Sequence, residues 1–129
     1  MIARELISDN IPPIKPEDSG LRALKWMEEF KVSHLPVVDG RTFVGIISDN
    51  DILDMEVPEQ PISTIAEMLD KVFINENKHY YDALKIISDE HLSVLPVLAD
   101  DGQYVGSISV NHIIEKLSHM AAVNVREVY

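Results

Sequence analysis

Apolar residues follow two different periods along this chain, and these periods outline its secondary structure. From Leu21 to Phe30 they recur every three or four positions, the spacing of one helix face, and the spacing returns from Ala83 to Ile87. Two denser apolar stretches, LPVV with FVGII and LPVL with YVGSI, are each interrupted by an Asp-Gly turn and predict β-hairpins. The pattern therefore predicts a mixed α/β (α+β) sandwich with helices and a small sheet in each half.

The elements recur because the chain contains an internal repeat. The stretch from Ala23 to Leu53 aligns with the stretch from Ala83 to Ile114. The spacing is 60 residues between Pro36 and Pro96 and becomes 61 after the turn, which is one residue longer in the second copy. Each half is too small to bury its own apolar face. We therefore expect the two halves to pack against each other about a pseudo-twofold axis.

This repeat divides the chain into four segments. Residues 1–56 form the first repeat, 57–63 a linker with two prolines, 64–121 the second repeat and 122–129 a C-terminal tail. We expect each repeat to open with a short helix, and the string IAREL near the N-terminus aligns with IAEML after the linker. The tail fits either a short terminal strand or the start of a further domain.

Composition narrows the function classes. The 129 residues include 11 Lys and Arg against 22 Asp and Glu. The resulting net charge of −11 argues against a protein that binds the phosphate backbone of a nucleic acid. The absence of cysteine excludes disulfides and thiolate metal sites. No stretch approaches the roughly 18 apolar residues of a membrane span, and the N-terminus lacks the apolar core of a signal peptide. We expect a cytoplasmic protein that binds neither nucleic acid nor membranes.

The repeated string VGIISDNDIL places Ser48 and Asp51 at a predicted helix start. Ser48 fits an N-cap, and Asp51 fits the reciprocal position of a capping box. A second interpretation is a ligand site, because a strand that ends at a helix N-terminus leaves free N–H groups. A carboxylate at that point can also accept hydrogen bonds from a ribose diol. The residues alone leave both interpretations open.

The two copies resemble the CBS (cystathionine-β-synthase) domain family in its tandem arrangement, the Bateman module. The resemblance rests on KVSHLPVVD with FVGIISDNDIL and on HLSVLPVLADDGQYVGSISVNHII, and it covers Ile2 to about Met120. It implies a pseudo-symmetric disc with two clefts between the repeats. It also implies a regulatory module without catalysis or a required cofactor, which binds AMP, ADP, ATP or S-adenosylmethionine and signals to a partner domain or protein.

In the first cleft, the resemblance implies that Ser48 and Asp51 contact the ribose and phosphate. The other repeat would supply the adenine wall. The residues implied for this cleft are Ile46, Ser48, Asp51, Val72, Phe73, Leu92, Ser93 and Val94. Basic residues are scarce around the motif, which indicates modest affinity or a ligand with little charge.

The mirror cleft departs from the family pattern. The residues implied for it are Val32, Ser33, His34, Ser109 and His112. His112 stands where the family carries an acidic or amide residue, and a neutral imidazole cannot accept two hydrogen bonds from a diol. We therefore expect the mirror cleft to be degenerate.

Two alternatives to ligand sensing stay open. His112, Glu115 and His119 fall on one helical face and could hold a metal, although a solvated polar face also explains them. The chain could instead be a dimerisation scaffold, since its last helix carries more apolar residues than one repeat needs: Ile113, Ile114, Leu117, Met120 and Ala121. We also expect the ligand-binding regulatory module to be a homodimer. An enzyme finds little support, because nucleophile-elbow and Gly-rich phosphate-loop motifs are missing.

Overall fold

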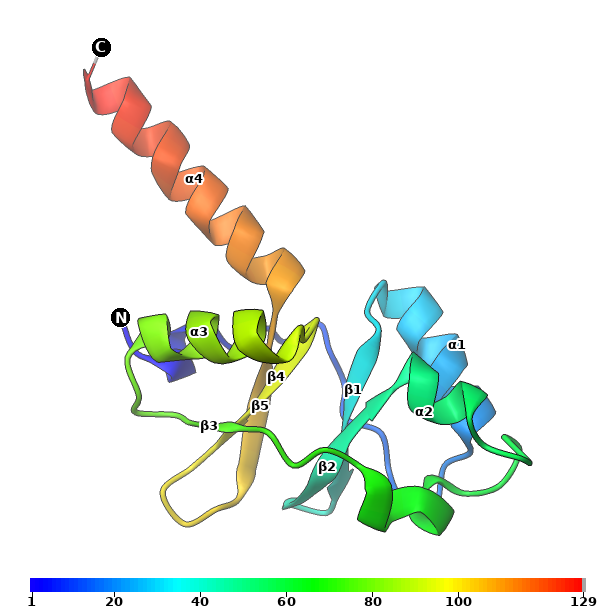
Figure 1. Cartoon of the computed structure of the whole chain (residues 1–129). Helices are drawn as coiled ribbons and strands as arrows, with labels where there is room; N and C mark the ends of the chain where they lie inside the picture. Colours follow the sequence, from blue (N-terminus) through cyan, green and yellow to red (C-terminus); the bar gives the residue numbers. More distant parts are fainter. Residues whose placement is uncertain (129) are drawn as a thin grey trace.

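The computed structural model describes the backbone of residues 1–128 and the side chains of residues 1–119. Figure 1 shows the helices and strands in chain order: η1 (Ala3–Leu6), α1 (Gly20–Phe30), β1 (His34–Asp39), β2 (Thr42–Ser48), α2 (Asp49–Leu53), η2 (Ile62–Met68), β3 (Ile74–Asn75), α3 (Tyr80–Glu90), β4 (Val94–Leu98), β5 (Tyr104–Ser109) and α4 (Val110–Val128). The mixed α+β fold with small sheets, predicted from the hydrophobic pattern, is confirmed.

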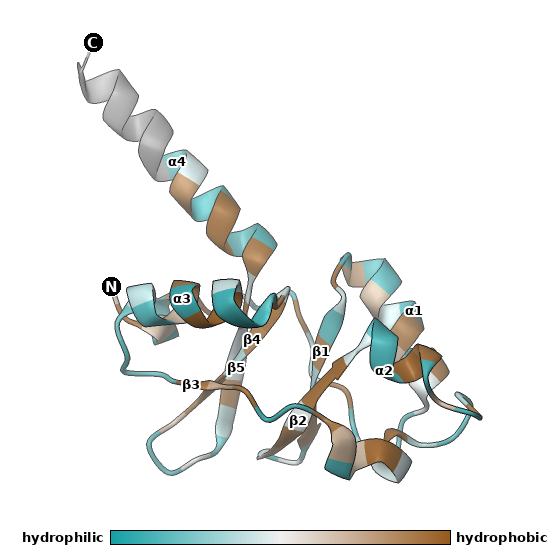
Figure 2. Cartoon of the chain, viewed as in Figure 1, coloured by the Kyte–Doolittle hydropathy of each residue, from teal (hydrophilic) through white to brown (hydrophobic). Residues whose placement is uncertain are grey.

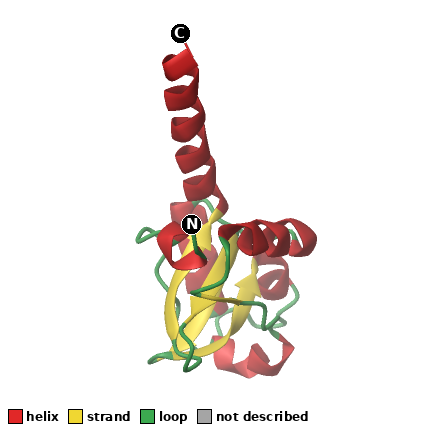
Figure 3. Ribbon diagram, turned by 90° about the vertical axis from the view of Figure 1, so that its left-hand side faces the viewer, coloured by secondary structure: helices red, strands yellow, loops and turns green. Residues whose placement is uncertain are grey.

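The strands form two small sheets that are related by the repeat. β1 pairs with β2 antiparallel, and in the second sheet β4 lies between parallel β3 and antiparallel β5. Ile14 forms a parallel bridge to Val37, which places an extended segment beside β1 as β3 lies beside β4. Gly40 and Gly102 close the two hairpins with φ of +64° and +86°, a conformation that strongly favours glycine. The shorter helices lie around the sheets, whereas α4 extends away from them (Figure 3).

The equivalent helices α1 and α3 end in the same way, and the apolar side of each faces the sheets (Figure 2). Ser19 is the N-cap of α1, and its side chain accepts a hydrogen bond from the N–H of Arg22 at 3.1 Å. Lys31 and His91 then terminate the two helices in the left-handed conformation, with φ of 58° and 53°. This sharp ending turns the chain directly into the central strands.

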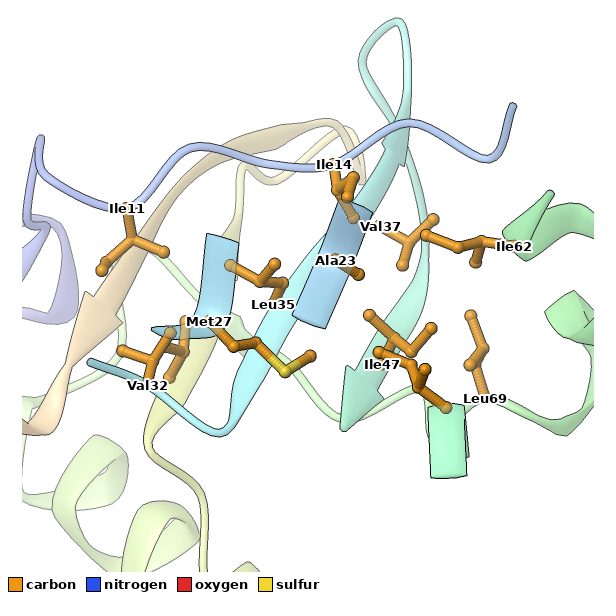
Figure 4. Close-up of a cluster of buried hydrophobic side chains, with 12 residues drawn as sticks. Ile11, Ile14, Ala23, Met27, Val32, Leu35, Val37, Ile47, Ile62 and Leu69 are labelled. Atoms are coloured by element: carbon orange, nitrogen blue, oxygen red, sulfur yellow. The ribbon is translucent and has the colours of Figure 1, made fainter. Parts of the chain in front are cut away.

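The two halves are interlocked, because the segment after α2 completes the core of the first half. Ile62, the first residue of η2, and Leu69, which follows its last residue, lie in the same buried cluster as Leu35 and Ile47 of the first sheet (Figure 4). The N–H of Ile46 donates a hydrogen bond to the carbonyl of Asp70 at 2.7 Å. The expected linker at 57–63 therefore ends inside the first core.

The N-terminal segment makes the reciprocal exchange. Ala3 and Leu6 of η1 lie in the core of the second half, and the N–H of Ser8 donates to the carbonyl of Ser107 at 2.8 Å. Although the short helix was expected to belong with the first repeat, it packs on the second. Each exchanged segment crosses the sheet of the other half.

Glycines in β2 and β5 make room for the exchanged segments. A Cβ on Gly45 would lie 2.8 Å from the Cβ of Leu69, and one on Gly106 would lie 2.6 Å from the Cγ2 of Ile7. Ile7 is thus the structural counterpart of Leu69. The alignment of IAREL with IAEML, which pairs Leu6 with Leu69, is wrong by one residue because backbone packing, not string similarity, sets the register.

The expected C-terminal tail is largely helical. α4 begins directly after β5 and runs to Val128, so residues 122–128 continue this helix instead of forming a separate strand. The side chains of Met120 and Ala121 lie outside the described residues. No helix in the described part of the chain has both the length and the apolar character required to cross a membrane.

Candidate functional site

A cleft of about 360 Å³ lies where the end of β2 and the start of α2 meet segments of the second half. We call it the first cleft. It is lined by Ser33, His34, Ile46, Ser48, Asp49, Asn50, Asp51, Asp70, Val72, Glu90, His91 and Leu92. Both halves contribute to its walls, so its shape depends on how they are joined.

Ser48 and Asp51, which both line this cleft, form a capping box at the start of α2. The Oγ of Ser48 accepts a hydrogen bond from the N–H of Asp51 at 3.2 Å, and the Oδ2 of Asp51 accepts one from the N–H of Ser48 at 2.9 Å. The capping interpretation is therefore confirmed. The Asp51 carboxylate can still accept further hydrogen bonds, because an ionised carboxylate offers about four lone pairs and the cap uses one.

The other backbone donors at the start of α2 are also occupied. The N–H of Asp49 donates to the carbonyl of Ser33 at 3.1 Å, and the N–H of Asn50 donates to the Oδ1 of Asp49 at 2.8 Å. The expectation of free N–H groups at this helix start is therefore wrong. The site offers carboxylate acceptors where a phosphate would need donors.

His34 and Ser93 join the two halves beside the cleft. The N–H of Ser93 donates to the Nδ1 of His34 at 3.1 Å, and the Oγ of Ser93 lies 2.8 Å from the same nitrogen. The N–H of Ser33 donates to the Ser93 Oγ at 3.0 Å. Because Nδ1 accepts a hydrogen bond from a backbone N–H, the imidazole is neutral with its proton on Nε2.

A sequence profile of the CBS domain matches residues 3–57 and 62–119, which together make up most of the chain. The chain belongs to the CBS-domain family. The two matches also correspond to the two halves of the internal repeat, so this is a CBS pair.

The relatives and structural neighbours agree with this assignment. An inosine-5′-monophosphate dehydrogenase of Korarchaeum cryptofilum is 27% identical over 125 residues, which cover 97% of this chain and 26% of the dehydrogenase. The chain thus spans about a quarter of the length of this curated relative.

Two solved structures share the fold. A CBS domain pair/ACT domain protein of Thermotoga maritima has a TM-score of 0.76 at 18% identity and covers 93% of this chain and 98% of its own. The structure of CBSX2 in complex with AMP has a TM-score of 0.70 at 23% identity, with the same coverage.

Five of the eight residues predicted for the first cleft of the CBS pair line it: Ile46, Ser48, Asp51, Val72 and Leu92. Phe73 is 46% exposed and packs edge-on against Phe43, with ring centroids 6.2 Å apart. Val94 is fully buried in the first core, and Ser93 lines a neighbouring hollow. The structure therefore places these three residues outside the cavity.

The residues predicted for the mirror cleft do not share one cavity. Ser33 and His34 line both the first cleft and the neighbouring hollow beside the start of α4, and Val32 is buried in the first core. Ser109 is buried and caps α4, since its Oγ accepts a hydrogen bond from the N–H of His112 at 3.2 Å. His112 itself lines a surface groove with Met1, Glu115, Lys116 and His119.

Other residues that line the first cleft were not predicted from the sequence. Asp70 reaches the cleft because its backbone pairs with Ile46, a contact between distant segments that leaves no sequence signal. Glu90 and His91 directly precede the predicted Leu92. Extending that segment backwards to the end of the predicted helix would have included both.

The metal alternative gains no support from the geometry. Residues 1–119 contain no group of three or more His, Asp or Glu side chains placed to hold a metal ion. The groove beside His112 also contains Lys116, whose Nζ donates a hydrogen bond to the carbonyl of Glu5 at 2.8 Å. A lysine ammonium repels a cation at this position.

The environment of His34 predicts a pH dependence of stability. Burial lowers the pKa of His34 below its ordinary value of 6.5, although the nearby charges of Asp49, Asp51 and Asp70 oppose the shift. The unfolded chain therefore binds this proton more readily than the folded chain. The stabilising contribution is present above the unfolded pKa and is lost as the pH falls below it.

Replacing His34 with valine tests this prediction, because the second half carries Val94 at the equivalent position. Between about pH 7.5 and pH 5.5, we expect the free energy of unfolding to fall more steeply for the wild type than for His34→Val. At neutral pH the variant should be about 1–2 kcal/mol less stable, because Ser93 loses its acceptor. Urea unfolding at several pH values measures both effects. Parallel pH profiles would contradict the prediction.

Proposed function

We propose that this CBS pair is a regulatory module that binds an adenosine-type ligand in the first cleft and signals to a partner domain or protein. AMP, ADP, ATP and S-adenosylmethionine are the candidate ligands. The observation that carries the proposal is the carboxylate of Asp51, which a capping box holds in the lining of a cavity built by both halves. The solved complex of CBSX2 with AMP supports the ligand class.

The lining suits the two parts of a nucleoside. Asp51 provides acceptors for the ribose hydroxyl groups, and the hydroxyl of Ser48 lies at the same helix start. Ile46, Val72 and Leu92 provide apolar surface for the base. Apolar walls with a few fixed polar groups are typical of small-molecule sites.

Regulation follows from the shared walls of the cleft. A ligand that touches both halves stabilises the arrangement in which both can contact it, and this shifts the population toward that arrangement. The hydrogen bonds of Ser33 and His34 to Ser93 lie beside the cleft and join the halves. The chain covers a quarter of its dehydrogenase relative, so we propose that it regulates catalysis located elsewhere and does not itself catalyse a reaction.

A dimerisation scaffold is the second candidate function. Ile114 and Leu117 of α4 are 55% and 46% exposed, while Ile113 is buried in the second core. Leu117 also lines an apolar groove of about 160 Å³ with Met1, Leu6, Tyr80, Leu84, Ile113 and Lys116. Exposed apolar surface of this kind favours a homodimer through α4.

Calorimetric titration with adenosine and AMP tests the proposed function. We expect saturable binding to the wild type and its loss in Val72→Trp, because the larger side chain fills the cleft. Val57→Trp is the control, since Val57 is exposed outside the cleft and its replacement should leave binding unchanged. If neither compound binds the wild type, ligand sensing is wrong and the scaffold becomes the better explanation.

A further inference from the structure

The charge of the first cleft is almost entirely negative. Asp49, Asp51, Asp70 and Glu90 all line it. No lysine or arginine is found among the described residues of its lining. Lys31 lines the neighbouring hollow with His34, and Lys71 lies in sequence between the lining residues Asp70 and Val72. This inventory is the opposite of a phosphate site, which needs cations or free N–H groups.

The remaining nitrogen donors near the cleft do not offset its negative charge. The N–H groups of residues 48 to 51 all donate to acceptors within the protein. His34 is neutral, because its Nδ1 accepts a hydrogen bond from the N–H of Ser93. His91, the other histidine of the lining, and Asn50, whose side-chain amide is uncharged, are both exposed. A phosphate would therefore meet four carboxylates without a fixed counter-charge.

We propose that the first cleft selects an adenosyl ligand that carries a positive charge, such as a sulfonium or ammonium group, in place of a phosphate. This inference rests on the proposed function and departs from the AMP-bound neighbour. The ribose of such a ligand would bind at Asp51. Its cationic group would lie among the carboxylates of Asp49, Asp70 and Glu90, where opposite charges attract.

Matched ligands separate charge from shape. S-adenosylmethionine and S-adenosylhomocysteine differ by one methyl group and the sulfonium charge, and adenosine and AMP differ by a phosphate. For the wild type at low ionic strength, we expect S-adenosylmethionine to bind at least about fivefold more tightly than S-adenosylhomocysteine. Adenosine should bind at least about fivefold more tightly than AMP measured with a chelator present. Calorimetry or equilibrium dialysis measures all four affinities.

A variant that neutralises carboxylates of the cleft tests whether these carboxylates cause the preference for a positively charged ligand. Asp70→Asn combined with Glu90→Gln removes two lining charges from exposed side chains, and both affinity ratios should fall toward one. Asp39→Asn combined with Glu28→Gln is the control. It changes the net charge by the same amount at exposed positions outside the cleft and should preserve the ratios.

The outcomes distinguish this inference from the proposed function. If no adenosine compound binds, both fail. If adenosine binds but AMP binds as tightly or more tightly, the proposed function stands and the charge selection is overturned. Equal affinity for S-adenosylmethionine and S-adenosylhomocysteine would also overturn it. If the cleft variant and the control variant change the two affinity ratios equally, the overall charge of the protein, and not the cleft, discriminates between the ligands.

Discussion

Replacing Ile62 with alanine should destabilise the protein by about 2–5 kcal/mol, although the residue lies in the segment expected to be a linker. Ile62 has no exposed surface and belongs to the first core, where it packs with Val37, Ile47 and Leu69 (Figure 4). Truncation removes buried methyl groups and leaves a cavity that its rigid neighbours cannot fill. Urea unfolding measures the loss as a change in the free energy of unfolding.

Met68→Ala provides the matched control, because Met68 belongs to the same short helix but is 77% exposed. We expect its effect to stay within about 0.5 kcal/mol. Trp26 packs against the first core and is the single tryptophan of the chain, so its fluorescence reports on that half. Circular dichroism reports on the whole chain.

Interlocked halves should unfold in one transition, so the two signals should coincide. Leu6→Ala, which truncates the second core, should then shift the Trp26 transition as well. If Ile62→Ala lowers the free energy of unfolding no more than Met68→Ala does, the packing of the segment after α2 is contradicted. Separate fluorescence and dichroism transitions would contradict the interlocking.

The elements of the fold were predictable because each leaves a local signal. The three- and four-residue apolar spacing marks α1 and α3, and the Asp-Gly turns mark both hairpins. The internal repeat then indicates that the halves are alike. These signals depend only on residues close in sequence, so they can be recognised without knowledge of tertiary contacts.

The exchange of segments between the halves was not predictable in this way. Ile62 follows two prolines and begins a short helix, which in sequence is typical of the end of a linker. Leu69, at the end of the same segment, reaches this core because Gly45 allows the chain there to cross β2 closely. The contact between Gly45 and Leu69 joins residues 24 positions apart, beyond the reach of any local pattern.

The candidate site was predictable in part for the same reason. Ser48 and Asp51 belong to a repeated local motif, and the structure confirms their capping box. The acidic character of the cleft depends on Asp70 and Glu90, which come from separate segments of the other half. The occupied N–H groups of α2 also depend on Ser33, a residue of a different segment. The helix cap of the site could be anticipated from the motif, but the shape and the full negative charge of the cleft could not, because residues of both halves determine them.

Replacing Asp51 with histidine should weaken adenosine binding by about 10- to 100-fold. The ribose loses a charged acceptor, and hydrogen bonds to charged groups contribute about 1.5–3 kcal/mol. The second half shows that the fold accepts histidine here, because His112 occupies the equivalent position and its N–H is still capped by Ser109 at 3.2 Å. The variant should lose only about 1 kcal/mol of stability, from the bond between the Asp51 carboxylate and the N–H of Ser48.

The comparison of adenosine with 2′-deoxyadenosine shows whether Asp51 acts on the ribose. In the wild type the missing hydroxyl should cost about tenfold in affinity, and in Asp51→His the two ligands should bind almost equally, because the acceptor for that hydroxyl is already gone. Asp54→His is the control: it removes the same charge from the end of α2, outside the cleft lining, and should preserve the preference for adenosine. If Asp51→His keeps the wild-type preference, the ribose binds elsewhere and Asp51 serves only as a helix cap.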